Sequence, residues 1–264
     1  ELRTPLNSII GFSRVILKGI DGPLTEMQEQ DLTTIHESGK HLLGLVNDIL
    51  DQAKIEAGKM ELSLGYFKLQ DVVRGVMSSA VGLTRDKPIQ LYTEIADDLP
   101  DAYGDEFRTR QVLLNLVSNA SKFTPQGSIT VSAFPIQENG QQFIQVSVAD
   151  TGIGIAAKDM GLLFQAFQQV DNSLTRSAEG TGMGLPLARS FTELQGGRIW
   201  VVSEPDVGST FSITVPVSPS PDEQADGSEP EQYDAPVTVK LEPLSPNQNR
   251  IVLVAEETVE MISL

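Results

Sequence analysis

The sequence predicts an α+β protein: a helical hairpin, expected to form a four-helix bundle as a dimer, followed by a two-layer α/β sandwich. Apolar residues recur at separations of three, four or seven over the first 60 residues, which is typical of amphipathic helices. From about Tyr66 to Val217 helical and strand patterns are mixed, which predicts a sheet layered with helices. Six prolines then interrupt an acidic, polar stretch, as in an extended linker. The expected parts are residues 1–62 (hairpin), 66–217 (sandwich), 218–250 (disordered linker) and 251–264 (start of another domain).

The hairpin consists of two predicted helices with one apolar stripe each. In the first helix the stripe runs from Leu2 to Ile20, and Asp21, Gly22 and Pro23 end it. The second helix has a heptad seam that ends near Gly58. Two such helices cannot bury both stripes alone, so a homodimer through the hairpin is predicted. The seam comprises Leu32, Ile35, Gly39, Leu42, Val46, Ile49 and Ala53.

Composition excludes several kinds of site. The formal net charge of −17 over 264 residues opposes binding to nucleic acid, whose phosphates need clustered Lys and Arg. The absence of cysteine excludes disulfides, thiolate zinc sites and cysteine nucleophiles, and two histidines are too few for a histidine-rich metal site. No apolar run is long enough to cross a bilayer, and a cytoplasmic location is expected. The chain begins at Glu1 and stops at Leu264 inside an apolar stretch, which suggests truncation; membrane attachment would then come only through upstream sequence.

The sandwich is predicted from three helices and five strands. The last two strands are joined by the turn from Pro205 to Gly208, a hairpin signal. The helices are expected at residues 69–83, 105–122 and 185–194, and the strands at 89–95, 128–133, 143–149, 199–203 and 210–215.

A polar stripe marks the second of these helices. Arg108, Gln111, Asn115, Asn119 and Lys122 are three or four residues apart and share one face. Such a stripe is usually a solvent-facing surface. Two asparagines one turn apart are unusual there, because Asn is a mediocre helix former, and carboxamide oxygens suit Mg²⁺.

Two glycine-rich turns follow. Asp150 ends the apolar face of a strand and precedes Gly152 and Gly154, so the pattern fits either a ligand site or a plain turn that closes the strand. Gly180, Gly182 and Gly184 directly precede a helix, whose free N–H groups can bind an anion. The hinge of a flexible lid would explain these three glycines nearly as well. The second turn is neither a dinucleotide fingerprint nor a Walker loop.

In this order, the asparagine helix and the two glycine turns resemble the ATP-binding fold shared by gyrase, Hsp90, MutL and histidine kinases. The resemblance covers about residues 66–217. It implies that ATP is the ligand, that Asn115 and Asn119 belong to the N box, with Asn119 as the Mg²⁺ ligand, and that Asp150 accepts a hydrogen bond from the adenine amino group. It further implies that Gly152 and Gly154 lie at the adenine base, that Gly180, Gly182 and Gly184 line the phosphates, and that Lys122 and Arg176 contact them.

Two further motifs resemble those of sensor histidine kinases. Residues 163–167, with Phe164 and Phe167, are similar to the F box, although simple core packing would also explain them. Residues 1–6 resemble the H box with its leading histidine removed. In that family the residue before this Glu is the phosphorylated histidine. By resemblance, Glu1 would help to draw the proton from the imidazole, and Thr4 would support dephosphorylation of the partner.

The implied reaction is transfer of the γ-phosphoryl group from Mg·ATP to a histidine and then to the receiver domain of a response regulator. His36 and His41 lie outside the H box and are not expected to be the acceptor. Two alternatives stay open: a nucleotide-gated ATPase of the gyrase and Hsp90 type, and a non-catalytic nucleotide-binding dimerisation module. Residues 168–179 would form a lid over the nucleotide. Residues 251–254 resemble the opening of a receiver domain. In this chain Ala255 stands where such domains have the first of two paired acidic residues.

Overall fold

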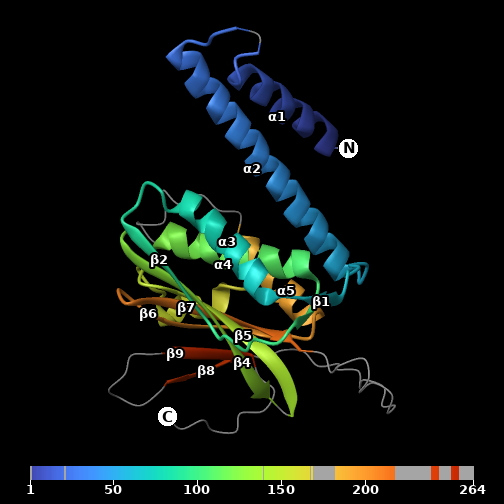
Figure 1. Ribbon diagram of the computed structural model, residues 1–264, viewed down its shortest axis with the longest axis vertical. Helices are drawn as coiled ribbons and strands as arrows, with labels where there is room; N and C mark the ends of the chain where they lie inside the picture. The colour runs from blue at the N-terminus through green and yellow to red at the C-terminus, as the bar shows by residue number, and fades with distance from the viewer. Residues whose placement is uncertain are drawn as a thin grey trace. The chain divides into compact units, whose positions relative to one another are not determined.

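The computed structural model describes residues 2–20, 22–138, 140–166, 168 and 182–217, together with the backbone of two later strands. The chain divides into two compact units, residues 1–60 and residues 61–264 (Figure 1). Each unit has its own secondary structure and is considered separately.

The first unit is the predicted helical hairpin. Helix α1 (Arg3–Leu17) packs against α2 (Glu26–Glu56), which begins with a capping box between Thr25 and Gln28. Helix α1 ends before the predicted Ile20, because Gly19 turns the chain with φ of +67°. Gly39 lets the two helices approach closely: a Cβ there would lie 3.0 Å from Ile10 Cγ1.

Part of the predicted seam of α2 stays exposed in the single chain. Ile35, Leu42 and Ile49 have relative exposures of 48%, 47% and 49%. They recur at intervals of seven and therefore form a stripe along one side of the helix. This stripe is the surface on which the predicted homodimer depends.

The second unit is a sheet covered on one face by three helices, α3, α4 and α5 (Figure 1), which confirms the predicted fold class. Its described strands have the order β2-β4-β5-β7-β6; β2 and β4 are parallel and the other pairs are antiparallel. The helices are α3 (Leu69–Leu83), α4 (Glu106–Phe123) and α5 (Gly184–Leu194), with a short 3-10 helix η1 (Ala157–Leu162). The strands are β2 (Ile89–Ile95), β4 (Gly127–Glu138), β5 (Gln141–Asp150), β6 (Ile199–Glu204) and β7 (Gly208–Pro216).

The core lies between the helices and the sheet. Each helix contributes one apolar side, and the strands contribute alternate residues, as their period of two requires. Fully buried members include Leu69, Val73 and Val76 of α3, Leu113 and Leu116 of α4, Phe191 of α5, and Ile129, Val131, Ile144 and Val146 of the sheet. Arg198, directly before β6, bonds to the residue that ends β4. Its Nε donates a hydrogen bond to Glu138 Oε2 at 3.1 Å. The Arg198 guanidinium carbon lies 4.0 Å from the centre of the Trp200 ring.

A two-stranded ribbon was not predicted. It pairs β1 (Gly65–Phe67) with β3 (Ala102–Gly104) in antiparallel register. Strands of three residues are too short for an alternating pattern to show in the sequence.

Two strands continue the sheet beyond β6. The backbone of β9 (Ile251–Ala255) pairs antiparallel with β6, and β8 (Val239–Pro243) pairs with β9. The other residues from 218 onward lie outside the described residues. The disordered linker and the separate C-terminal domain therefore stay predictions.

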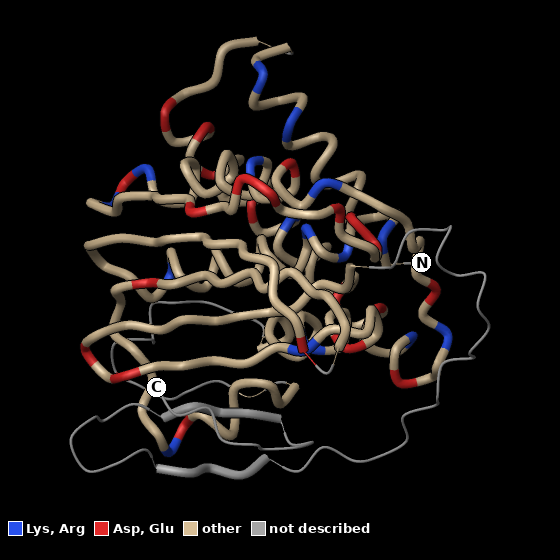
Figure 2. The backbone as a smooth tube through the Cα atoms, turned by 60° about the horizontal axis from the view of Figure 1, so that its bottom comes forward, with Lys and Arg blue, Asp and Glu red and all other residues tan. Residues whose placement is uncertain are grey.

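Charged residues are spread widely over the described backbone. Lys and Arg positions are interspersed with acidic ones rather than gathered on one element, and the strands are largely uncharged (Figure 2). Among the described residues, no helix combines the length and the hydropathy that a membrane span requires.

Candidate functional site

Asp150 lies at the end of a central strand, β5, between β4 and β7. Its Oδ1 accepts a hydrogen bond from the backbone N–H of Gly152 at 2.8 Å. Burial raises the pKa of Asp150 to about 6, although backbone N–H donors from Gly152 and Ser209 and the nearby Thr124 hydroxyl lower it in part. Asp150 is therefore a partly buried hydrogen-bond acceptor at the end of β5.

The turn after Asp150 needs glycine for contacts with the protein's own backbone. A Cβ at Gly152 would overlap the carbonyl oxygen of Phe123, which also accepts a hydrogen bond from Ile153 N at 3.2 Å. Gly154 has φ of +64°, and a Cβ there would overlap the carbonyl oxygen of Glu204. These contacts fasten the turn to the end of α4 and to the β6–β7 hairpin.

Helix α4 presents its predicted polar stripe toward α5 rather than wholly to solvent. Near its start, Arg108 Nη1 donates to Gln111 Oε1 at 2.9 Å, and the Arg108 guanidinium carbon lies 4.5 Å from the Phe191 ring centre. Two turns on, the side-chain nitrogen of Asn115 is buried and has no hydrogen-bond partner among the described residues. Asn119 is partly buried one turn further along. A plain solvent-facing stripe does not explain a buried, unsatisfied carboxamide.

The amino end of α5 meets Asn115. A Cβ at Gly184, the first residue of α5, would overlap the Asn115 Oδ1. Gly182 turns the chain into the helix with φ of +68°, and Pro186 is buried in the first turn, where its missing N–H costs nothing. The first N–H groups of a helix have no intrahelical partners and attract anions. The structure thus brings Asn115 to a potential anion site.

Two residues that the sequence analysis missed shape the end of α4. Lys87 Nζ donates to the carbonyl oxygen of Ser121 at 2.6 Å and lies 3.5 Å from that of Thr124. Thr124 is completely buried beside Asp150. No signal in the sequence identifies Lys87, because it is 34 residues from its partner and belongs to no motif.

The other predicted residues are placed as follows. Lys122 Nζ lies 5.3 Å from the Phe123 ring centre, near the end of α4. Phe164 is partly buried, and the Arg189 guanidinium carbon of α5 lies 5.9 Å from its ring centre. Thr4 is exposed on α1. The predictions for Glu1, Phe167, Arg176 and Gly180 concern positions outside the described residues, as does the proposed lid except Gln168.

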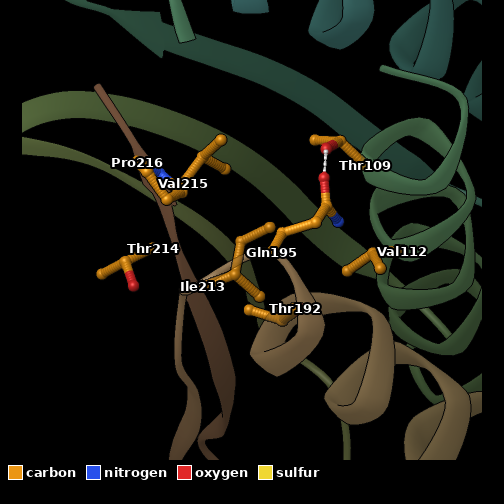
Figure 3. Close-up of a pocket in the computed structure, with 8 residues that line it drawn as sticks. All are labelled: Thr109, Val112, Thr192, Gln195, Ile213, Thr214, Val215 and Pro216. Carbon is orange, nitrogen blue, oxygen red and sulfur yellow. Dashed lines mark hydrogen bonds between the residues drawn. The ribbon is translucent and has the colours of Figure 1, made fainter. Parts of the chain in front are cut away.

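A small pocket lies at the opposite end of α4, between α4, α5 and β7 (Figure 3). The α4 residues that line it, Thr109 and Val112, lie in the first turns, far along the helix from Asn119. Gln195 occupies its centre and accepts hydrogen bonds from Thr109 Oγ1 at 3.2 Å and from the Asp105 N–H at 2.7 Å. Neither Asp150 nor the contact between Asn115 and Gly184 belongs to the lining of this pocket.

Comparison with known families agrees with both units. The His Kinase A (phospho-acceptor) domain profile matches residues 1–58. The profile of the histidine kinase-, DNA gyrase B- and HSP90-like ATPases matches residues 104–219. The fold and the site therefore define the class of the second unit: an ATPase domain of this type.

Individual relatives give the same result. The chain is 43% identical to the Non-motile and phage-resistance protein of Caulobacter vibrioides over 82% of this chain and 26% of the relative. It is also 43% identical to the circadian input-output histidine kinase CikA of Synechococcus elongatus, over 82% of this chain and 28% of CikA. The crystal structure of full-length ShkA in complex with AMPPNP has a TM-score of 0.68 and 33% identity, over 83% of this chain and 45% of ShkA.

The chain belongs to the sensor histidine kinases. The phospho-acceptor profile distinguishes it from the gyrase and Hsp90 branch, which was one of the two alternatives. The chain spans about a quarter of the length of these two curated relatives.

Proposed function

We propose that the second unit binds Mg·ATP at a site that includes Asp150, Asn115 and Gly184, and that the chain transfers the γ-phosphoryl group to a histidine for relay to a response regulator. The contact of the Asn115 carboxamide with the amino end of α5 carries this proposal. It supplies a buried, unsatisfied polar group beside helix N–H groups, which together suit a phosphate chain and its cation. The relationship to ShkA, crystallised with AMPPNP, supports a nucleotide at this site.

Each residue of the site has a role that follows from its chemistry. The Asp150 carboxylate, which accepts the Gly152 N–H at the end of β5, would accept a further hydrogen bond from the adenine amino group. Gly152 and Gly154 hold the turn below the base. The N–H groups that begin α5 bind phosphate oxygens, and Lys122 at the end of α4 contributes a positive charge.

The metal site is proposed from the chemistry of α4. Asn115 and Asn119 present carboxamide groups one turn apart, and such oxygens are ligands for Mg²⁺, which usually shares its coordination with phosphates. The buried Asn115 Nδ2, which has no hydrogen-bond partner among the described residues, is a donor and would suit a phosphate oxygen beside the metal. Bound Mg²⁺ would supply neutralisation of the phosphate charge.

The first unit would carry the acceptor. A histidine directly before Glu1 would lie at the start of α1, in the H box that residues 1–6 resemble. Glu1 would accept the imidazole proton, and Thr4, which is exposed, would act in dephosphorylation of the partner. The exposed stripe of α2 supports a homodimer through the hairpin. Because ATP is the phosphoryl donor, we place this part of the protein in the cytoplasm.

Radiolabel transfer from γ-labelled ATP tests the reaction. A chain with one histidine and a short helical extension before Glu1 should acquire a label that is labile in acid and stable in base, as expected of a phosphoramidate. The chain that starts at Glu1 is the matched control and should stay unlabelled. Asn119→Ala should abolish the label, whereas His36→Ala and His41→Ala should preserve it.

The result also separates catalysis from simple nucleotide binding. If the extended chain binds ADP by calorimetry but never acquires label, it is a non-catalytic nucleotide-binding module. If an acid-labile label appears on the control chain and disappears with His36→Ala, the phospho-acceptor is His36 on α2 and not a histidine before Glu1.

A further inference from the structure

Helices α4 and α5 are in contact at both of their ends. At one end, a Cβ at Gly184, the first residue of α5, would overlap the Asn115 Oδ1. At the other end, Gln195, the residue after α5, accepts a hydrogen bond from the backbone N–H of Asp105, the residue before α4, at 2.7 Å. The two contacts are ten residues apart along α4 and eleven along α5, which is about 15–17 Å of helix in each case. The two helices are therefore antiparallel and matched in length between their contacts.

The contact made by Gln195 is directional. Besides the Asp105 N–H, its Oε1 accepts a hydrogen bond from the Thr109 hydroxyl of α4 at 3.2 Å (Figure 3), and its Nε2 donates to the Phe191 carbonyl oxygen of α5 at 2.8 Å. The carboxamide thus bonds to one helix through its oxygen and to the other through its nitrogen. Hydrogen bonds require a narrow range of distances and angles, whereas apolar packing is non-directional. Gln195 therefore restricts how far α5 can slide along α4.

The donor that meets Gln195 is itself held firmly at the start of α4. Asp105 is 6% exposed, and its carboxylate accepts the Arg108 N–H at 3.0 Å through Oδ1 and the Ser63 N–H at 2.9 Å through Oδ2. A Cβ at Gly104 would lie 2.7 Å from the Gln195 Oε1, so the backbone before α4 fits closely around the carboxamide. The α5 end is consequently fastened to a fixed point of α4.

We propose that Gln195 is a positioning residue of the nucleotide site: it fixes the axial register of α5 against α4 and thereby the place of the α5 amino end beside Asn115. Gln195 lies at the opposite end of α5 from the phosphate site and acts only through the helix. This inference rests on the proposed function, because the α5 amino end and Asn115 are the groups that we assign to the phosphates and their cation.

The first test measures the affinity of the full chain for ADP by calorimetry. Methionine has about the length of glutamine but lacks a strong acceptor, so Gln195→Met removes the hydrogen bonds to α4 and should weaken ADP binding about fivefold. Gln195→Glu keeps an acceptor oxygen for the Asp105 N–H and should recover most of the affinity. Leu194→Met, at the neighbouring position with 46% exposure, is the control and should bind ADP as wild type does.

A double-mutant cycle with Gly184→Ala separates positioning from a general structural role. Because Gly184→Ala displaces the Asn115 side chain, the α5 amino end no longer matches Asn115, and its exact place matters less. Addition of Gln195→Met to Gly184→Ala should therefore weaken ADP binding by a much smaller factor than Gln195→Met alone. Residues this far apart that act independently would instead show losses that multiply.

Losses that multiply would overturn the inference, as would unchanged ADP affinity in Gln195→Met that circular dichroism shows to be folded. If Gln195→Met does not fold, Thr109→Val takes its place in the same cycle, since it removes one of the two hydrogen bonds to α4 and nearly keeps the side-chain shape. A smaller loss that does not multiply is then expected, and unchanged affinity overturns the inference. If wild type binds neither ADP nor ATP, the proposed function itself fails.

Discussion

The carboxamide of Asn115 in α4 occupies the space that a side chain at Gly184 in α5 would need. Both helices are packed on the sheet, and the Asn115 amide is buried, so neither partner can move away freely. Asn115, which we propose as part of the nucleotide site, therefore also determines which residue can stand at the start of α5.

Gly184→Ala should disturb the site more than the fold. The added methyl group must displace the Asn115 side chain, so we expect at least a tenfold loss of ADP affinity and a loss of about 1–3 kcal/mol in the free energy of unfolding. Calorimetry and denaturant unfolding measure the two quantities. Gly82→Ala is the matched control, since a Cβ there meets nothing within 4 Å, and it should leave ADP binding unchanged. Equal affinity in Gly184→Ala and wild type would contradict the expected clash.

Nucleotide affinity should depend on the protonation of Asp150. The pKa of about 6 lies above the ordinary 3.8, so protonation stabilises the fold as the pH falls, and this contribution is lost as the pH rises through about 6. Affinity for ADP has the opposite dependence, because the carboxylate is the form that accepts the adenine amino proton. Binding by wild type should therefore weaken as the pH falls from 7.5 to 5.

Asp150→Asn provides the reference for this pH dependence, since other groups and the ligand also titrate. The ratio of wild-type to Asp150→Asn affinity, measured by calorimetry, should be large at pH 7.5 and should shrink below pH 6. A ratio that is constant over this range would show that Asp150 does not contact the nucleotide as a carboxylate.

Charged residues in the exposed stripe of α2 should separate the dimer. Leu42→Glu combined with Ile49→Glu places two like charges in the expected interface, so the chain should sediment as a monomer that still binds ADP. Gln30→Glu with Thr33→Glu adds the same charge at exposed positions more than 100° around the helix from Leu42 and should remain dimeric. A wild-type chain that sediments as a monomer at micromolar concentration would refute the interface.

Lys87→Met should destabilise the second unit by about 1–2 kcal/mol, because it removes a charged donor from the carbonyl groups that end α4. Denaturant unfolding measures the loss. Lys87→Arg keeps a cation there and should recover part of it. Arg85→Met, at an exposed neighbouring position, is the control and should be nearly neutral. If Lys87→Met and Arg85→Met have the same free energy of unfolding, the contacts of Lys87 with the carbonyl groups that end α4 do not stabilise the second unit.

The sequence allowed most of the fold to be predicted, because period and turn residues are local signals. Helix α3 and strand β2 have the predicted bounds, and β4 extends five residues past its predicted end. The motifs likewise led to Asn115 and Gly184, which the structure brings into contact, and to Asp150 at the end of β5. Lys87 and Thr124 could not be found in this way, since their importance comes from contacts between distant segments. Glycine is required at 152 and 154 because the backbone of Phe123 and Glu204 lies beside them in the folded chain, and the sequence alone gives no sign of these contacts.

Trp200 is the only tryptophan of the chain, and it lies on β6 against the Arg198 guanidinium. Its fluorescence emission therefore reports the unfolding of the sheet in the second unit and receives no tryptophan signal from the hairpin. Circular dichroism at the wavelengths typical of helices, by contrast, reports the unfolding of both units. A dimeric hairpin would melt at a temperature that rises with protein concentration. The unfolding temperature reported by Trp200 emission would instead rise with nucleotide concentration. The native protein thus carries a built-in optical reporter for one of its two units.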